Sequence, residues 1–383
     1  MKVGILTYHR AFNYGAHLQA CALCNRLNEE EDIDAEIIDF QMEREKKHYE
    51  VKYYSWNRTI RSLLKGRYFF ERALEKSFKK AVNNPVMRKS DQYMVSDSTD
   101  DFAKFVDGKY DVIIVGSDEV WKTNNFRGFP SPYWLFGNLH CRKMSYAASS
   151  RVSFRDTLTA EEYPMVQNAL QDFQFIGVRD ELTYKEVKRA LRHENNIHLC
   201  CDPSFLYDFD VSDTAVWDRL ARKPKFDKTK KTIIVMLDNP QMADQILKNL
   251  SDFNLVSVHK HHPGFINFPD LEPMEWLCLI KNADFIIASF FHAVCFSIVF
   301  NKPFLALGTK KKKSKLAELL NDPVFASQYI DDGELSNIKE RINMIMRSPR
   351  DYSEIVANNR KSFDVFLKEL RRQPEQNAGS EEK

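Results

Sequence analysis

Short apolar runs alternate with amphipathic stretches along most of the chain. Residues 3–8 form the first apolar run, and in residues 16–28 the side chains of Leu18, Ala22 and Leu23 lie near one face of a helix. The pattern predicts further strands at residues 35–39, 111–116, 143–148, 175–178, 232–237, 255–259, 284–288 and 303–307, and helices at residues 161–172, 181–191, 241–250 and 273–281. Nearly continuous apolar strands separated by helices are typical of parallel sheets that are covered on both faces.

Two such series of strands and helices predict an α/β fold with two Rossmann-like, doubly wound domains. We expect the hinge between them inside residues 202–231, where Pro203, Pro224 and a polar run are unsuited to a core. The predicted order is a first domain at 1–205 with a basic, mostly helical insertion at 41–100, a second domain at 206–334, helices at 335–371 and a disordered tail at 372–383.

Charge and composition narrow the classes of partner. Of the 383 residues, 43% are hydrophobic and 29% are charged, as in ordinary globular proteins, and the net charge of +2 argues against nucleic-acid binding. Residues 41–90 nevertheless hold fourteen Lys and Arg against five Asp and Glu. Two interpretations of this insertion stay open: a face for an anionic glycan or a membrane-borne acceptor, with peripheral membrane contact, or a solvated helical excursion.

Cysteine usage and hydropathy indicate a cytoplasmic protein. The seven cysteines form no tight framework, and the N-terminus lacks the apolar core of a signal peptide. Residues 283–300 come closest to a membrane span, but Asp284, Ser289 and His292 interrupt them. We therefore expect a buried strand followed by a buried helix in this stretch.

The turn after the first predicted strand is one candidate ligand site. Asn13, Tyr14, Gly15 and Ala16 open the first helix, at the edge of a parallel sheet where helix N–H groups meet anions. The turn has no Gly-x-Gly-x-x-Gly fingerprint for dinucleotides. The alternative is a purely structural tight turn.

Two more strand ends carry candidate residues. Gly116 and Ser117 are small enough for close ligand approach, and Asp118 or Glu119 can accept a sugar hydroxyl or a proton. Alternatively, Ser117 or Asp118 only caps the next helix. Arg179 leaves another strand, where its guanidinium can clamp a phosphate or carboxylate with two hydrogen bonds. The alternative for Arg179 is a structural salt bridge.

His292 is the most informative candidate, because it lies at a strand-to-helix junction together with Ser289 and Phe291. Desolvation among apolar neighbours can lower the pKa of an imidazole and suit it to proton transfer near neutrality. The alternative is a histidine whose hydrogen bonds are satisfied within the core.

Other clusters predict no metal site. Cys21 and Cys24 have thioredoxin-like spacing but lack a second pair, and the histidines at 259, 261 and 262 have no carboxylate partner. The lysine run at 310–315 is interpreted as a solvated helix start, with contact to acidic lipid or glycan as the alternative.

Taken together, these segments resemble the polysaccharide pyruvyl transferase family. The motifs that carry the resemblance follow one another from about residue 3 to residue 310: Gly4-Ile5-Leu6-Thr7 with Asn13-Tyr14-Gly15-Ala16-His17-Leu18-Gln19-Ala20, Gly116-Ser117-Asp118-Glu119-Val120-Trp121, Val178-Arg179-Asp180, Cys201-Asp202-Pro203-Ser204, and Ser289-Phe290-Phe291-His292-Ala293 with Asn301-Lys302-Pro303. Each motif is weak alone, but five in order are fairly specific.

The resemblance implies a glycosyltransferase-B-like arrangement of the two domains with phosphoenolpyruvate in the cleft between them. It implies transfer of a pyruvyl group to a sugar of a polysaccharide or lipid-linked glycan precursor as a ketal. His292 would be the general acid/base, Arg179 would hold the phosphate or carboxylate, and no cofactor would be needed.

Three departures from the family pattern leave other functions open. Ser289-Phe290 stands where the family usually has Asp-Ser or Asp-Arg before the aromatic-His pair, so one polar or cationic contact is missing. Ala293 replaces the glycine after the histidine, and if Phe290 stands where some members carry arginine, other residues must hold the anion. A sugar-nucleotide-dependent glycosyltransferase of the same architecture and a non-catalytic glycan-binding relative are therefore the alternatives.

Overall fold

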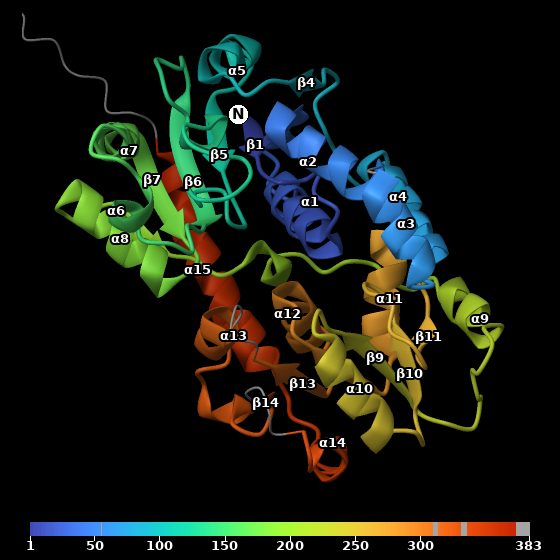
Figure 1. Cartoon of the computed structure of the whole chain (residues 1–383). Helices are drawn as coiled ribbons and strands as arrows, with labels where there is room; N and C mark the ends of the chain where they lie inside the picture. Colours follow the sequence, from blue (N-terminus) through green and yellow to red (C-terminus); the bar gives the residue numbers. More distant parts are fainter. Residues whose placement is uncertain (55, 309–312, 331–334, 373–383) are drawn as a thin grey trace, which may run out of the picture.

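The computed structural model describes residues 1–54, 56–308, 313–330 and 335–372. The tail predicted at 372–383 lies, apart from Arg372, outside the described residues. Two six-stranded parallel sheets dominate the fold, one above the other in Figure 1. They follow one another along the chain.

The first sheet has the strand order β2-β1-β5-β6-β7-β8. Its strands are β1 (Lys2–Leu6), β2 (Asp34–Ile37), β5 (Val112–Val115), β6 (Arg142–Ala148), β7 (Phe173–Val178) and β8 (Ile197–Leu199). Alternate residues point to opposite faces, so Ile114 packs in the cluster formed with α1 (Tyr14–Asn28), whereas Ile113 packs with α5 (Thr99–Val106), α7 (Glu162–Gln171) and α8 (Glu181–Leu191). Helices therefore cover both faces, as predicted.

The second sheet has the order β11-β10-β9-β12-β13-β14. Its strands are β9 (Thr232–Met236), β10 (Asn254–Ser257), β11 (Ile266–Asn267), β12 (Phe285–Ala288), β13 (Phe304–Leu307) and β14 (Tyr329–Ile330). One face packs on α10 (Pro240–Asn249) and α14 (Ile338–Arg347), and the other on α11 (Pro273–Asn282) and α12 (Phe291–Val299). The cluster on the α11–α12 face continues into the α1 face of the first sheet, so one apolar core joins the two halves.

The insertion in the first half is mainly helical. It contains β3 (Phe40–Gln41), α2 (Glu43–Tyr54), α3 (Trp56–Leu64), α4 (Tyr68–Val82), β4 (Met94–Val95) and α5. Phe70, Leu74 and Phe78 of α4 pack against the core cluster that contains α1. The insertion is thus anchored beside the first turn of α1.

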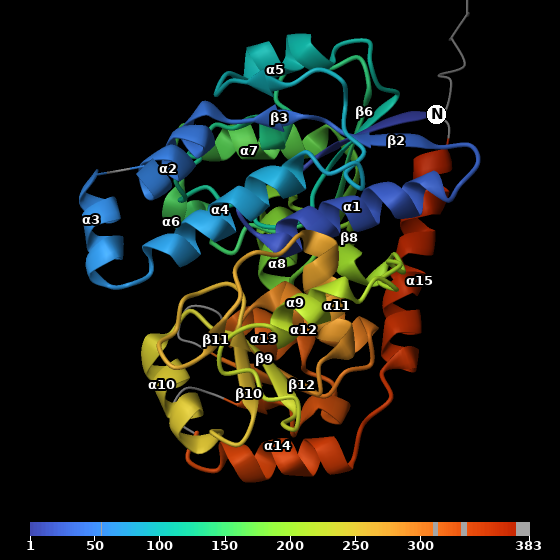
Figure 2. The same cartoon turned by 90° about the vertical axis from the view of Figure 1, so that its right-hand side faces the viewer.

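The last helix, α15 (Ser353–Arg371), returns from the second half to the first and runs along both (Figure 2). Arg142 of β6 donates hydrogen bonds to the carbonyl oxygens of Glu369 and Leu370, at 2.9 and 2.7 Å. The helix therefore bridges the two sheets at the side of the molecule. Among the described residues, no helix is long and apolar enough to cross a membrane.

Candidate active site

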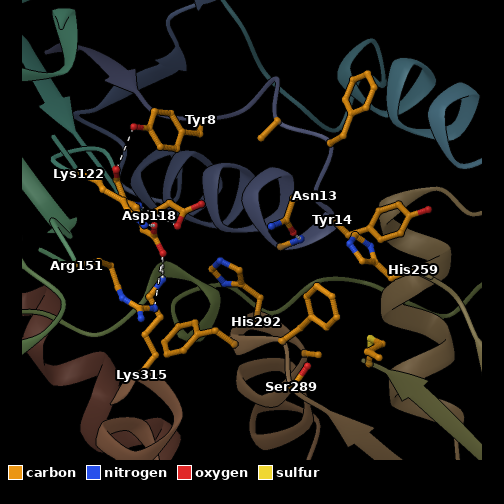
Figure 3. Close-up of a pocket in the computed structure, with 18 of the residues that line it drawn as sticks. Tyr8, Asn13, Tyr14, Asp118, Lys122, Arg151, His259, Ser289, His292 and Lys315 are labelled. Atoms are coloured by element: carbon orange, nitrogen blue, oxygen red, sulfur yellow. Dashed lines mark hydrogen bonds and ion pairs between the residues drawn. The ribbon is translucent and has the colours of Figure 1, made fainter. Parts of the chain in front are cut away.

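A cavity of about 550 Å³ lies between the two halves, where loops follow the carboxyl ends of β1, β5, β9 and β12. Both halves of the molecule contribute to its wall, as the labelled side chains in Figure 3 show. Of the residues predicted for the site, the lining includes Asn13, Tyr14, Gly15, Asp118, Ser289, Phe291 and His292. Ala16, Gly116, Ser117 and Arg179 are not in the lining.

The first turn of α1 forms one wall of the cavity. Asn13 caps the helix, since its Oδ1 accepts a hydrogen bond from the N–H of Gly15 at 2.9 Å. Tyr14 donates its hydroxyl hydrogen bond to the carbonyl of Leu271 in the second half, at 3.0 Å. A methyl group on Gly15 would lie 2.3 Å from Cδ2 of His292, so only glycine allows this approach. The fully buried Ala16 lies behind the turn.

His292 stands in the first turn of α12, and its imidazole points into the cavity (Figure 3). Its Nδ1 lies 3.5 Å from Oδ1 of Asp202 and 3.4 Å from Oγ of Ser204. These contacts fix the ring and leave Nε2 as the nitrogen on the opposite side. The neighbouring Ser289 is fully buried, and its Oγ has no hydrogen-bond partner within the described part of the chain.

Asp202 joins the two residues that were expected to be catalytic. Its Oδ2 accepts a 2.7 Å hydrogen bond from Nη1 of Arg179, while its Oδ1 faces His292. Burial disfavours the charged form of Asp202, but His292 and Arg179 outweigh this effect and hold the pKa of Asp202 far below its usual value. The carboxylate is therefore ionised and can orient the imidazole through Nδ1.

Arg179 is enclosed and does not reach the cavity. Its side chain is 4% exposed, and its guanidinium lies 4.8 Å from the ring centre of Phe291. Asp118 lies 3.7 Å from the same guanidinium. Arg179 thus lies outside this cavity, in an ion pair with Asp202, and lines a neighbouring cavity of about 420 Å³ that shares Phe291 and Lys315 with the first.

The turn after β5 contributes Asp118 to the lining of the cavity. The two residues before it, Gly116 and Ser117, do not line the cavity. Gly116 has φ +135°, and a Cβ there would lie 2.1 Å from the carbonyl oxygen of Tyr146. Ser117 is fully buried, with its Oγ 3.4 Å from Asp202. Gly116 and Ser117 therefore support the wall from within.

A group of cations that sequence analysis did not select surrounds Glu119. Nζ of Lys315 lies 2.8 Å, Nζ of Lys122 3.0 Å and Nη1 of Arg151 3.7 Å from its carboxylate, and all four residues line the cavity. Burial would raise the pKa of Glu119, but Lys315 and Lys122 lower it well below normal. One negative charge thus faces three positive charges.

Two features mark Lys315 and Arg151 in this cluster of cations around Glu119, one in the sequence and one in the backbone. The lysine run contains Lys315, whose side chain is only 13% exposed, so the interpretation as a solvated helix start is wrong for this residue. Arg151 adopts φ +58°, a left-handed conformation that is unusual outside glycine and is enriched at functional sites. Residues 310–312 lie outside the described residues.

Aromatic side chains form the opposite wall. Phe12 and Tyr49 of α2 stack at 4.7 Å between ring centres, and Phe126 also lines the cavity. Phe290 lies against His259, with ring centres 4.6 Å apart. The cavity therefore has a charged end and an aromatic end, joined at His292.

Within the described residues, no group of three or more His, Cys, Asp or Glu side chains is arranged to hold a metal ion. Burial raises the pKa of both Cys21 and Cys24 to about 12. These two thiols are therefore protonated near neutral pH.

Comparison with known proteins identifies the family. The model of the family described as polysaccharide pyruvyl transferase matches residues 13–311. The chain belongs to this family. The match contains the first turn of α1, the turn after β5 and the His292 segment, so the family's transferase character and the site described above occupy the same part of the chain. No match to a curated protein was found.

Solved structures of other proteins show the same fold. The UDP-GlcNAc 2-epimerase from Methanocaldococcus jannaschii is 13% identical, with a TM-score of 0.56 over 96% of this chain and 99% of that chain. UDP-GlcNAc 2-epimerase from Neisseria meningitidis bound to UDP-GlcNAc is 11% identical, with a TM-score of 0.54 over 97% and 99%. These likenesses confirm the two-domain, glycosyltransferase-B-like α/β architecture of this pyruvyl transferase family member.

Proposed function

We propose that this protein transfers the pyruvyl group of phosphoenolpyruvate to two hydroxyls of a sugar in a polysaccharide or lipid-linked precursor, forming a ketal. The observation that carries the proposal is the position of His292. It lies between a cation-rich end and an aromatic end of one cavity and is oriented by an ionised Asp202. The family supplies the reaction class.

The charges of the cavity suit this donor. Phosphoenolpyruvate carries a phosphate and a carboxylate, and Lys122, Arg151 and Lys315 gather at one end of the cavity around Glu119. We assign the anionic groups of the donor to these three cations. Arg179, which was expected to hold an anion directly, is assigned to the positioning of Asp202, because its Nη1 donates a hydrogen bond to that carboxylate and the side chain does not line this cavity.

The chemistry follows from a proton on His292. Its imidazolium gives the proton to the methylene carbon of the donor, and positive charge develops on the adjacent carbon. A sugar hydroxyl attacks that carbon and gives its proton to the imidazole, which is neutral after the first step. The bond between the carbon and the phosphate oxygen then breaks and phosphate leaves with the bonding electron pair. A second hydroxyl attacks the same carbon and closes the ketal, and its proton leaves with the phosphate. Asp202 orients the ring, and a general acid of this kind contributes on the order of 10²–10⁴-fold. The reaction is redox-neutral and calls for no cofactor.

The aromatic end is assigned to the acceptor. Phe12, Tyr49 and Phe126 present flat apolar faces, which suit the C–H faces of a sugar ring while the hydroxyls remain free to react. We place the protein in the cytoplasm, because its seven cysteines are all unpaired, as is usual in a reducing compartment.

Thermal shift measurements test the donor assignment. Ligands that bind the folded protein raise its melting temperature, so phosphoenolpyruvate is expected to stabilise the wild type. Arg151→Ala and Lys315→Ala should abolish the shift, while Lys339→Ala, which removes a cation paired with Asp252 elsewhere, should retain it. Stabilisation by UDP-GlcNAc and not by phosphoenolpyruvate would replace the proposal by the glycosyltransferase alternative. Glycan binding without turnover of any donor would favour the non-catalytic alternative.

A further inference from the structure

The hairpin of α3 and α4 carries an unusual concentration of exposed apolar side chains. Four of the twelve large apolar side chains that are exposed in the described residues fall within ten positions of one another. Their exposed fractions are 40% for Ile60, 51% for Leu63, 83% for Leu64 and 82% for Phe69. Contiguous exposed apolar surface of this kind marks a contact with a partner or a membrane.

These residues do not belong to an incomplete core. Phe70, Leu74 and Phe78 on the inner side of α4 are buried in the main cluster, so the helix already has a packed face. Figure 2 shows α3 at the outer edge of the molecule, on the side away from α15, and α4 running inward from it toward α1. Gly66 between the helices has φ +64°, and a Cβ there would meet no atom within 4 Å, so the turn projects into open space. The apolar side chains therefore point outward from an anchored hairpin.

Positive charge surrounds the apolar tip. Residues 59–82 contain seven Lys and Arg against two Asp and Glu. Arg61 and Lys65, which flank Leu63 and Leu64, are both exposed. Apolar side chains next to exposed cations are typical of elements that lie in the interface of an anionic bilayer.

We infer that this hairpin docks the protein on an anionic lipid bilayer. Leu64 and Phe69 enter the interfacial layer, and Arg61 and Lys65 contact the phosphate-bearing headgroups. The charge of the basic insertion fits a face for an anionic glycan or a membrane-borne acceptor, and it also fits a solvated helical segment, so charge alone does not decide between them. The apolar tip favours the membrane, because Leu64 and Phe69 gain free energy when they leave water and a solvated segment would keep them exposed.

The position of the hairpin links docking to the site. Tyr49 of α2 lines the cavity, and α2 packs against both α3 and α4. A docked hairpin therefore holds the aromatic end of the cavity near the bilayer surface, where a lipid-linked sugar is found. This last step rests on the proposed function, whereas the docking itself does not.

Vesicle flotation tests the docking without any reaction. Wild-type protein should float with phosphatidylcholine vesicles that contain phosphatidylglycerol, and much less with phosphatidylcholine alone. Leu64→Ser/Phe69→Ser should reduce the bound fraction by at least about tenfold, because each side chain contributes strongly when it leaves water. Met344→Ser/Val365→Ser is the matched control, since these side chains are 53% and 50% exposed on other helices. It should float like the wild type.

Salt and charge variants separate the two contributions. Arg61→Glu/Lys65→Glu should lose binding to the phosphatidylglycerol vesicles, and high salt should weaken the wild type in the same direction. Absence of wild-type flotation at low salt would overturn the inference. A second result would also overturn it: the wild type self-associates in light scattering and binds no vesicles, and Leu64→Ser/Phe69→Ser loses the self-association. The tip would then join two copies of the chain.

The outcome is independent of the donor assignment. The Leu64→Ser/Phe69→Ser variant should keep the thermal shift with phosphoenolpyruvate, because neither residue lines the cavity. A protein that floats but shows no such shift would retain the docking and lose the proposed donor. A protein that shows the thermal shift with phosphoenolpyruvate but does not float would retain the proposed donor and lose the docking.

Discussion

At the scale of single residues, the contact between Gly15 and His292 determines the shape of the site. The helix of one half and the helix of the other half meet there, and a side chain on Gly15 would occupy the place of the imidazole. Because the ring is held on its other side by Asp202, it cannot move aside without losing that partner. The glycine is required by packing, since its backbone lies in an ordinary helix.

Gly15→Ala is therefore expected to lower turnover without unfolding the protein. The added methyl group displaces the imidazole from its contact with Asp202, and a misplacement of this size costs about 10²-fold in rate. Phosphate release from phosphoenolpyruvate in the presence of acceptor measures the loss. Gly108→Ala is the control, because a Cβ there would meet no atom within 4 Å although its φ is +67°. Equal activity of the two variants would show that the contact has no catalytic consequence.

His17 gives the folded state a specific sensitivity to acid. Burial lowers its pKa from 6.5 to about 3, so the folded protein keeps it neutral where the unfolded chain binds a proton. Between pH 6.5 and pH 3 the unfolded state therefore binds more protons, and stability decreases as the pH falls. At pH 5 this loss is about 2 kcal/mol relative to pH 7.

The comparison of wild type with His17→Leu isolates this effect. Urea unfolding at pH 7 and pH 5 should show a decrease in the free energy of unfolding that is about 2 kcal/mol smaller in the variant. Other titrating groups contribute equally to both proteins. An identical decrease in the two proteins would mean that His17 is protonated in the fold.

At the scale of elements, α15 holds the two halves together. Phe366 packs edge-on against Tyr146 of β6 and Phe175 of β7, at 5.0 and 5.3 Å between ring centres. Arg371 forms an ion pair with Asp32 at 2.6 Å on the same side of the first half. The helix follows the second half in the chain and packs against the first. Unfolding of either half therefore removes contacts that stabilise the other half.

Phe366→Ala should destabilise the whole molecule by about 3–5 kcal/mol, because it leaves a cavity in a fully buried aromatic cluster. Val365→Ala on the same helix is the control, since that side chain is 50% exposed and its loss should change stability by less than about 0.5 kcal/mol. Urea unfolding followed by tryptophan fluorescence gives both values. A change confined to the control range in Phe366→Ala would show that α15 does not stabilise the interface.

The elements that could be predicted are the ones with long apolar patterns. The central strands β1, β5, β9 and β12 were predicted because each carries four or more consecutive buried residues. The edge strands β8, β11 and β14 were not, since they have two or three residues and present one face to solvent. Their pairing is decided by the neighbouring strand rather than by their own sequence.

At the scale of the whole molecule, the site arises from segments that meet only after both halves have packed. Strand ends indicated the positions of Asn13, Asp118 and His292, because the carboxyl ends of parallel strands gather on one edge. The position of Arg179 at a strand end did not predict that its side chain pairs with Asp202. Strand ends also could not place Lys315 beside Glu119, which precedes it by 196 residues.

The departures from the family pattern are explained at this scale as well. Phe290 replaces a cationic residue of some members, but it lies at the aromatic end of the cavity against His259. Arg151 and Lys315 bring positive charge from other elements to the opposite end. The positive charge of the cavity thus comes from positions other than residue 290.

Phosphate release from phosphoenolpyruvate, with a panel of nitrophenyl glycosides as acceptors, tests the central claim most directly. Wild type should release phosphate and form a ketal that is visible by NMR, and His292→Ala should lose on the order of 10²–10⁴-fold of this rate while keeping its thermal shift with phosphoenolpyruvate. Wild-type turnover in His292→Ala would contradict the claim that this imidazole protonates the donor.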